Sequence, residues 1–113
     1  MISYPRYEHP EIPACIHVGL IFEHAETARA FVEKYAPGGE MRYQFRDSTF
    51  EYRNGLLIFT FCKAYNTNLV RGERFHAIFS SPEVRASEWY RDECRFKWSY
   101  ADFAWDANTM AIS

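Results

Sequence analysis

The chain has 113 residues, of which 48% are apolar, 19% aromatic and 25% charged. This length allows one domain, since two domains would each be too small to close a core, and the many rings exclude a disordered chain. Thirteen Lys and Arg against fifteen Asp and Glu leave a net charge of −2. This balance argues against a dedicated duplex-binding domain, because such domains are usually basic.

The apolar runs and the cysteines indicate a cytoplasmic protein. The runs are far shorter than a membrane span, so no membrane partner is expected. Cys15, Cys62 and Cys94 are isolated, and no C-x-x-C pair occurs. Their number and spacing favour neither a disulfide framework nor a zinc site, and they fit a reducing compartment.

The first third of the chain predicts an arm, a strand and a helix. Residues 1–13 are polar and contain several prolines, as is typical of an extended arm. The short apolar run at 15–22 favours a buried strand. Apolar residues recur at helical spacing over 24–36, and Pro-Gly-Gly follows at 37–39, which predicts an amphipathic helix that ends there.

The middle of the chain predicts a β-hairpin. Residues 41–45 and 49–53 alternate apolar and polar side chains, which is the period of a half-buried strand. Residues 56–62 are apolar on both faces, as a central strand requires. Asn54-Gly55 between these runs is a strong hairpin signal, because both central positions of such a turn need positive φ. A turn at this dipeptide pairs Tyr52 with Leu57 and Phe50 with Phe59.

Beyond the hairpin, the pattern predicts a loop, a strand and a second helix. Residues 63–73 are polar and form the one internal loop long enough to carry a function. Residues 75–79 return as a short strand. Ser80 and Glu83 have the spacing of a capping box, and the proline between them suits a first helical turn. A helix is therefore expected to run to about Arg95.

These elements predict an α/β (α+β) fold in a single domain over 1–113. We expect a mixed β-sheet of about four to five strands, with the Asn-Gly hairpin at its centre and two helices packed on it. The tail at 99–113 is rich in aromatic residues, and its conformation stays open.

The sequence carries no motif for catalysis, metal binding or cofactor binding. Neither G-x-x-x-x-G-K-[ST] nor G-x-G-x-x-G occurs, so the backbone cradle for nucleotide phosphates is missing. The histidines never pair with another His or Cys at metal-ligand spacing. We therefore expect no catalytic residue, no metal and no cofactor. An enzyme with an unrecognised site stays an alternative, and it would use His17, His24 or His76.

Two groups of residues are candidates for partner contacts. For a protein partner, they are Arg71 and Arg74 in the polar loop and Phe103 and Trp105 in the tail, because Trp and Arg dominate binding hot spots. Trp105 stands between two aspartates, which predicts that it is exposed. Single-stranded or structured nucleic acid is held by rings and arginines through stacking and charge. The candidates for that contact are Arg42, Arg46, Arg53, Lys63, Arg71 and Arg74.

Three short segments resemble the core of phage terminase-type motor ATPases. Within residues 16–83, they are Asn54-Gly55-Leu56-Leu57-Ile58, Leu69-Val70-Arg71-Gly72 and Phe75-His76-Ala77-Ile78-Phe79. The family runs from an Asn-Gly strand through a polar loop with LRG or VRG to an apolar strand that ends in Asp-Glu. Its phosphate-binding loop is absent from this chain. Ser80-Ser81-Pro82 stands in place of the acids, with Glu83 displaced into the next helix. The resemblance implies a phage or other mobile-element source and a degenerate ATPase-like domain without the acids that hold Mg²⁺.

The sequence as a whole favours a non-enzymatic small binding protein. We expect it to dock on a larger host or phage protein assembly as an accessory protein or an inhibitor, with host defence systems among the targets considered. A nucleic-acid-binding domain is the first alternative. A degenerate nucleotide-binding domain or small enzyme is the second.

Overall fold

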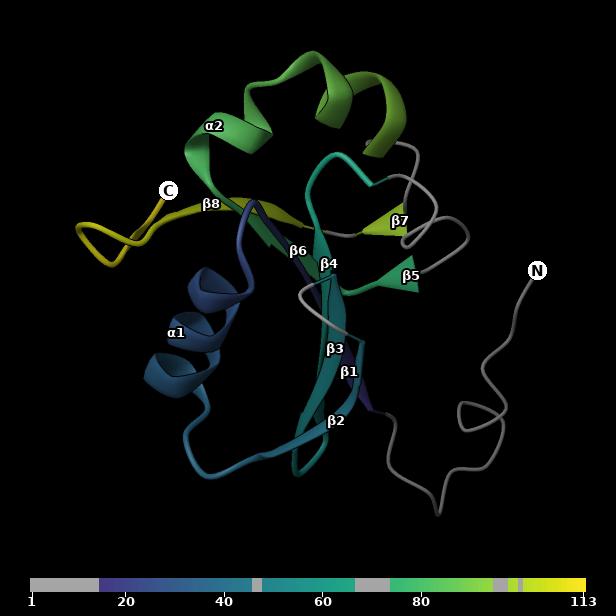
Figure 1. Cartoon of the computed structure of the whole chain (residues 1–113), viewed down its shortest axis with the longest axis vertical. Helices are drawn as coiled ribbons and strands as arrows, with labels where there is room; N and C mark the ends of the chain where they lie inside the picture. Colours follow the sequence, from purple (N-terminus) through teal and green to yellow (C-terminus); the bar gives the residue numbers. More distant parts are fainter. Residues whose placement is uncertain (1–14, 46–47, 67–73, 95–97, 100) are drawn as a thin grey trace.

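A computed structural model describes residues 15–45, 48–66, 74–94, 98–99 and 101–113. In these residues seven strands form one mixed sheet in the order β2-β3-β4-β1-β6-β8-β9 (Figure 1). Those strands are β1 (Ile16–Phe22), β2 (Glu40–Phe45), β3 (Thr49–Asn54), β4 (Leu57–Lys63), β6 (Ala77–Ser80), β8 (Asp102–Asp106) and β9 (Ala111–Ile112). A smaller sheet pairs β5 (Arg74–Phe75) with β7 (Trp98–Ser99). The helical segments are α1 (Ala25–Tyr35), α2 (Pro82–Arg85) and the π-helical turn η3 (Tyr90–Cys94).

The predicted fold class is confirmed, but the predicted strand number is too low. The chain forms a single α/β domain with a mixed sheet that contains the expected hairpin, and α1 is the helix predicted over 24–36. The main sheet has seven strands because the tail at 99–113 adds β8 and β9. The predicted arm at 1–13 and most of the predicted loop at 63–73 lie outside the described residues.

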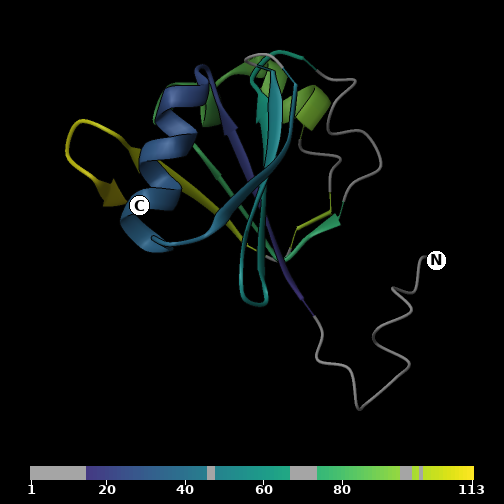
Figure 2. The ribbon, with the colours of Figure 1, turned by 60° about the horizontal axis from the view of Figure 1, so that its bottom comes forward.

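The sheet has a parallel centre with antiparallel flanks. β4, β1, β6 and β8 run parallel, whereas β2, β3 and β9 join through antiparallel pairs. Alternate residues of β1 point to opposite faces. Leu20 and Phe22 pack in the core under α1, whereas Ile21 packs with Val84 of α2. α1 therefore covers one face, and α2, η3 and β5 cover the other (Figures 1 and 2).

The hairpin forms, but its turn lies one residue later than predicted. The observed cross-strand pairs are Tyr52 with Phe59 and Phe50 with Phe61, so the predicted partners are wrong. Gly55 and Leu56 make the turn, and of these only Gly55 has a positive φ, 61°, as the first central position of a type II′ turn requires. Asn54 stays in β3 because its side-chain amide donates to the carbonyl oxygens of Ala36 and Pro37, at 3.0 and 2.9 Å.

The predicted second helix is broken into α2 and η3. The break is at Ser87, whose hydroxyl donates to the carbonyl oxygen of Val84 at 2.6 Å and accepts from the backbone N–H of Tyr90 at 3.2 Å. This side chain competes with the helical hydrogen bonds of its own backbone and starts a new segment. No helix in the described ranges is long and apolar enough to cross a bilayer.

Candidate functional site

Trp105 lies in the core and not on the surface. β8 turns its side chain toward α1, where it is 0% exposed. The indole packs edge-on against Phe22 and Phe31, with ring centroids 5.9 and 5.2 Å away, and its Nε1 donates to Oη of Tyr35 at 3.1 Å. The predicted exposure of Trp105 is therefore wrong. The two aspartates that suggested it belong to the other face of the strand, because side chains alternate along β8.

Of the other residues predicted to contact a protein partner, only Phe103 has a side chain that the structure describes. Phe103 is half-buried, and its ring stacks on Phe79 with centroids 5.1 Å apart. Arg71 lies outside the described residues. Arg74 begins β5, but its side chain is not described. Contacts through these three residues stay predictions.

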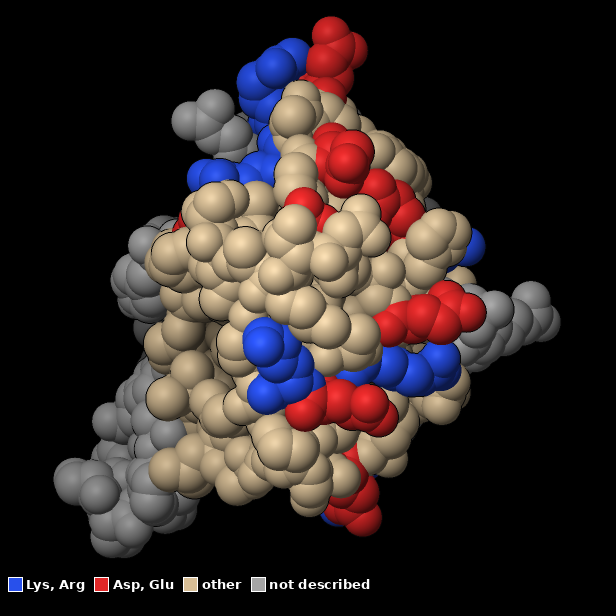
Figure 3. All heavy atoms as spheres, turned by 90° about the vertical axis from the view of Figure 1, so that its left-hand side faces the viewer, with Lys and Arg blue, Asp and Glu red and all other residues tan. Residues whose placement is uncertain are grey.

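The predicted nucleic-acid surface is partly neutralised by acids. Nε of Arg42 lies 3.2 Å from Oε1 of Glu40, and Nε of Arg53 lies 2.9 Å from Oε2 of Glu51. Lys63 is exposed at the end of β4. The side chains of Arg46, Arg71 and Arg74 are not described. On the α1 side of the molecule, Figure 3 shows acidic and basic side chains interspersed, without a basic field.

The carboxyl ends of β1 and β6 are joined through Glu23 and Ser81. The Ser81 hydroxyl donates to Oε1 of Glu23 at 2.9 Å and accepts from the backbone N–H of Val84 at 3.2 Å, which makes it the cap of α2. The predicted cap, Ser80, is wrong: its Oγ is buried and has no hydrogen-bond partner within the described structure. The segment after β6 therefore anchors α2. No group of three metal-ligating side chains is found in the described residues.

His17 and His76 hold neighbouring segments together. The backbone N–H of His17 donates to Nδ1 of His76 at 3.0 Å, and the N–H of His76 donates to the carbonyl oxygen of His17 at 2.7 Å. The two rings stack with centroids 6.2 Å apart. His24 is exposed at the start of α1. The enzyme alternative that would use one of these histidines stays a prediction.

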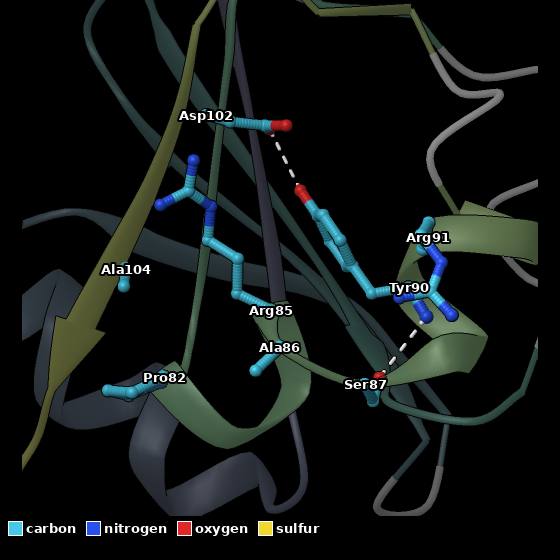
Figure 4. A pocket seen from close by; sticks show the side chains of 8 residues that line it. All are labelled: Pro82, Arg85, Ala86, Ser87, Tyr90, Arg91, Asp102 and Ala104. Atoms are coloured by element: carbon cyan, nitrogen blue, oxygen red, sulfur yellow. Dashed lines mark hydrogen bonds between the residues drawn. The ribbon is translucent and has the colours of Figure 1, made fainter.

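An open pocket of about 640 Å³ lies between α2, η3 and β8 (Figure 4). Arg85 extends from α2 across it, and Arg91 lines it from η3. Asp102 of β8 is at its far side, where its Oδ1 accepts a hydrogen bond from the Tyr90 hydroxyl at 2.8 Å. The side chains of Pro82, Ala86, Ser87 and Ala104 complete the lining. We call this the α2–β8 pocket.

A second feature is an apolar surface beside Trp105. Tyr35, Met110 and Ile112 are three of the six large apolar side chains that are exposed in the described residues. The Tyr35 hydroxyl lies 3.5 Å from the carbonyl oxygen of Met110, and Ile112 pairs with Trp105 across β8 and β9. We call these three residues the α1–β9 surface.

Sequence reasoning predicted neither feature. Helical spacing places Tyr35 on the buried stripe of its helix, yet in the last turn of α1 it is 40% exposed. Arg85 stands among alternating charges that are typical of a solvated helix face. The one signal that was present is the apolar pair Met110 and Ile112 in the last part of the tail, where the other residues of 106–113 are small or polar.

Comparisons with known proteins return a weak likeness. No protein-family model matches this chain, and no curated protein matches its sequence. The fold is similar to that of the large terminase of a thermophilic bacteriophage in complex with ADP, with a TM-score of 0.48 and 11% sequence identity. The match covers 83% of this chain and 26% of the terminase chain. It is a weak, partial resemblance, consistent with the motifs found in the sequence.

Proposed function

We propose that this protein is a non-enzymatic binding protein that docks on a larger host or phage protein assembly, as an accessory protein or an inhibitor. The α1–β9 surface carries the proposal. Exposed apolar side chains that lie near one another on a domain mark a candidate site for a protein partner. The terminase-like motifs of the sequence support a phage or mobile-element source, and a host defence complex is one of the assemblies that we consider as its target.

The α1–β9 surface borders an edge of the sheet. β9 is the last strand in the sheet order. Ser113 exchanges two backbone hydrogen bonds with Ala104, at 3.0 and 2.9 Å. Because bonded and non-bonded pairs alternate in an antiparallel ladder, the N–H and C=O of Ile112 point away from β8. β9 is only two residues long, but its unpaired N–H and C=O can bond to an extended segment of another protein.

The side chains around this edge define the partner's chemistry. An added strand would place an apolar side chain against Tyr35, Met110 and Ile112. Nζ of Lys34 lies 5.5 Å from the Tyr35 ring centroid, so one end of the surface carries a positive charge. The partner we propose is an extended protein segment in which an apolar residue is followed by an acidic one.

Site-specific crosslinking tests this proposal. A photo-reactive residue at position 112 is expected to give a discrete adduct in a lysate of the native host cells, because a partner covers that position. Unlabelled wild-type protein should compete for the adduct, whereas the variant Ile112→Glu should not, since a buried charge opposes docking.

Leu56 provides the matched control. It is 49% exposed, close to the 45% of Ile112, but lies in the hairpin turn and not in the α1–β9 surface. The same photo-reactive residue at position 56 is expected to give no discrete adduct. Equal adducts from both positions, or none from position 112, would contradict docking through the α1–β9 surface.

A further inference from the structure

The α2–β8 pocket lies on the other face of the sheet from the α1–β9 surface. Trp105 and Phe103 of β8 point toward α1, whereas Asp102 and Ala104 line the pocket under α2. The volume of about 640 Å³ is within the range of small-ligand sites. The pocket is therefore a separate site, and what it binds does not depend on docking at the α1–β9 surface.

The charges in the lining leave an excess of one positive unit. Arg85 and Arg91 contribute two cations and Asp102 one anion. The Tyr90 hydroxyl already donates to Asp102. Arg91 lies 3.7 Å from Glu88 and 3.6 Å from Asp92. Arg85 makes no ion pair with any described residue, and in Figure 4 its guanidinium lies in the pocket.

The rim of the pocket selects against polyanions. Glu88 and Asp92 are exposed and lie 3.7 and 3.6 Å from Arg91, which lines the pocket. A nucleic-acid backbone would bring several negative charges past these acids and be repelled. A single anion that enters the pocket meets Arg85 while its own body stays away from the acidic rim.

The remaining lining favours an apolar body on that anion. Pro82, Ala86 and Ala104 contribute no charge and no side-chain hydrogen-bonding group, and the ring of Tyr90 adds an aromatic wall. The planar guanidinium matches the two oxygens of a carboxylate in a two-pronged contact. We infer that the α2–β8 pocket binds one carboxylate group carried on a short apolar body and paired with Arg85. A free monocarboxylic acid and a glutamate side chain of a protein share this chemistry.

Titration of the ¹⁵N-labelled full chain with 4-methylpentanoate tests the inference. Saturable amide-shift changes are expected at 83–91 and 101–104, and the neutral 4-methylpentanamide should cause none. Arg85→Gln should weaken binding about ten-fold or more, as the loss of a charged two-pronged contact implies. Arg85→Lys keeps the positive charge but not the planar guanidinium, and it should weaken binding less than Arg85→Gln does. The spectrum of each variant reports whether the fold is kept.

Arg42→Gln is the matched control, because it removes an exposed arginine at the opposite edge of the sheet and should leave binding unchanged. A second arm compares a capped peptide with one glutamate between leucines against its glutamine counterpart. Tighter binding of the glutamate peptide than of 4-methylpentanoate assigns the pocket to a protein side chain, and the reverse assigns it to a free acid. Equal shifts from the neutral amide, stronger binding of inorganic phosphate, or unchanged binding by Arg85→Gln would overturn the inference.

Discussion

Trp105 is the largest of the fully buried side chains in the described residues. Its indole meets Phe22 and Phe31 edge-on and donates to the Tyr35 hydroxyl. Trp105→Ala should lower the free energy of unfolding by about 3–5 kcal/mol, because it leaves a cavity under α1. Urea unfolding followed by circular dichroism measures this loss. Ile112→Ala, an exposed change next to it, should cost no more than about 0.5 kcal/mol; similar losses for both variants would contradict the packing of Trp105.

Two adjacent serines give a second test at the scale of single residues. Ser81→Ala removes the cap of α2 and the hydrogen bond to Glu23, and should cost about 1 kcal/mol. Ser80→Ala removes a buried hydroxyl without a described partner, so it should be neutral or stabilising. Thermal unfolding of the two variants measures the difference. A larger loss of stability from Ser80→Ala than from Ser81→Ala would contradict the assignment of Ser81 as the cap of α2.

The join between α1 and the hairpin depends on Tyr52. Its hydroxyl donates to the carbonyl oxygen of Ala36 and accepts from the backbone N–H of Gly39 at 2.7 Å. The end of the helix and the turn after it are thus fixed to β3. Tyr52→Phe leaves the Gly39 N–H without this partner and removes one of the two side-chain hydrogen bonds to the Ala36 carbonyl oxygen, since the bond from the Asn54 amide remains. It should cost about 1–3 kcal/mol.

Denaturant unfolding measures the effect of Tyr52→Phe, with Tyr65→Phe as the control. Tyr65 is 54% exposed in the turn after β4, so loss of its hydroxyl should change stability by less than about 0.5 kcal/mol. Faster amide exchange at Ala36, Gly38 and Gly39 in Tyr52→Phe alone would locate the effect where α1 meets the hairpin. Equal stability of the two variants would remove this role for Tyr52.

The whole molecule is expected to unfold in one step. The core under α1 and the core under α2 and η3 are built on alternate residues of the same strands, β1, β4 and β6. If one core is lost, the strands that support the other core are lost as well, so the two cores should unfold together. Tryptophan fluorescence and far-ultraviolet circular dichroism should give the same midpoint in urea. Separate midpoints would show that the two faces are independent.

Local patterns in the sequence predicted the class of fold and several elements. The alternation of Phe50 and Tyr52 fixed the face that β3 buries, and the helical spacing before Pro37 located α1. These predictions hold because periodicity is a property of neighbouring residues, and burial of one face follows from it directly. The helix break at Ser87 was missed, since a hydroxyl that binds its own backbone competes with the helical pattern without changing it.

The two candidate surfaces depend on contacts between distant parts of the chain. Tyr35 meets Trp105 and Met110 across separations of 70 and 75 residues, and Arg85 shares a pocket with Asp102. A local sequence pattern does not predict these contacts, because they depend on the order of the strands in the sheet. The sequence by itself determined the α/β class, α1 and the hairpin, which arise from short-range periodicity and turn geometry. Only the tertiary structure decided that Trp105 is buried and that Tyr35 and Ile112 face solvent beside it, since the order of the strands sets which residues of the tail lie inside and which part of α1 they cover.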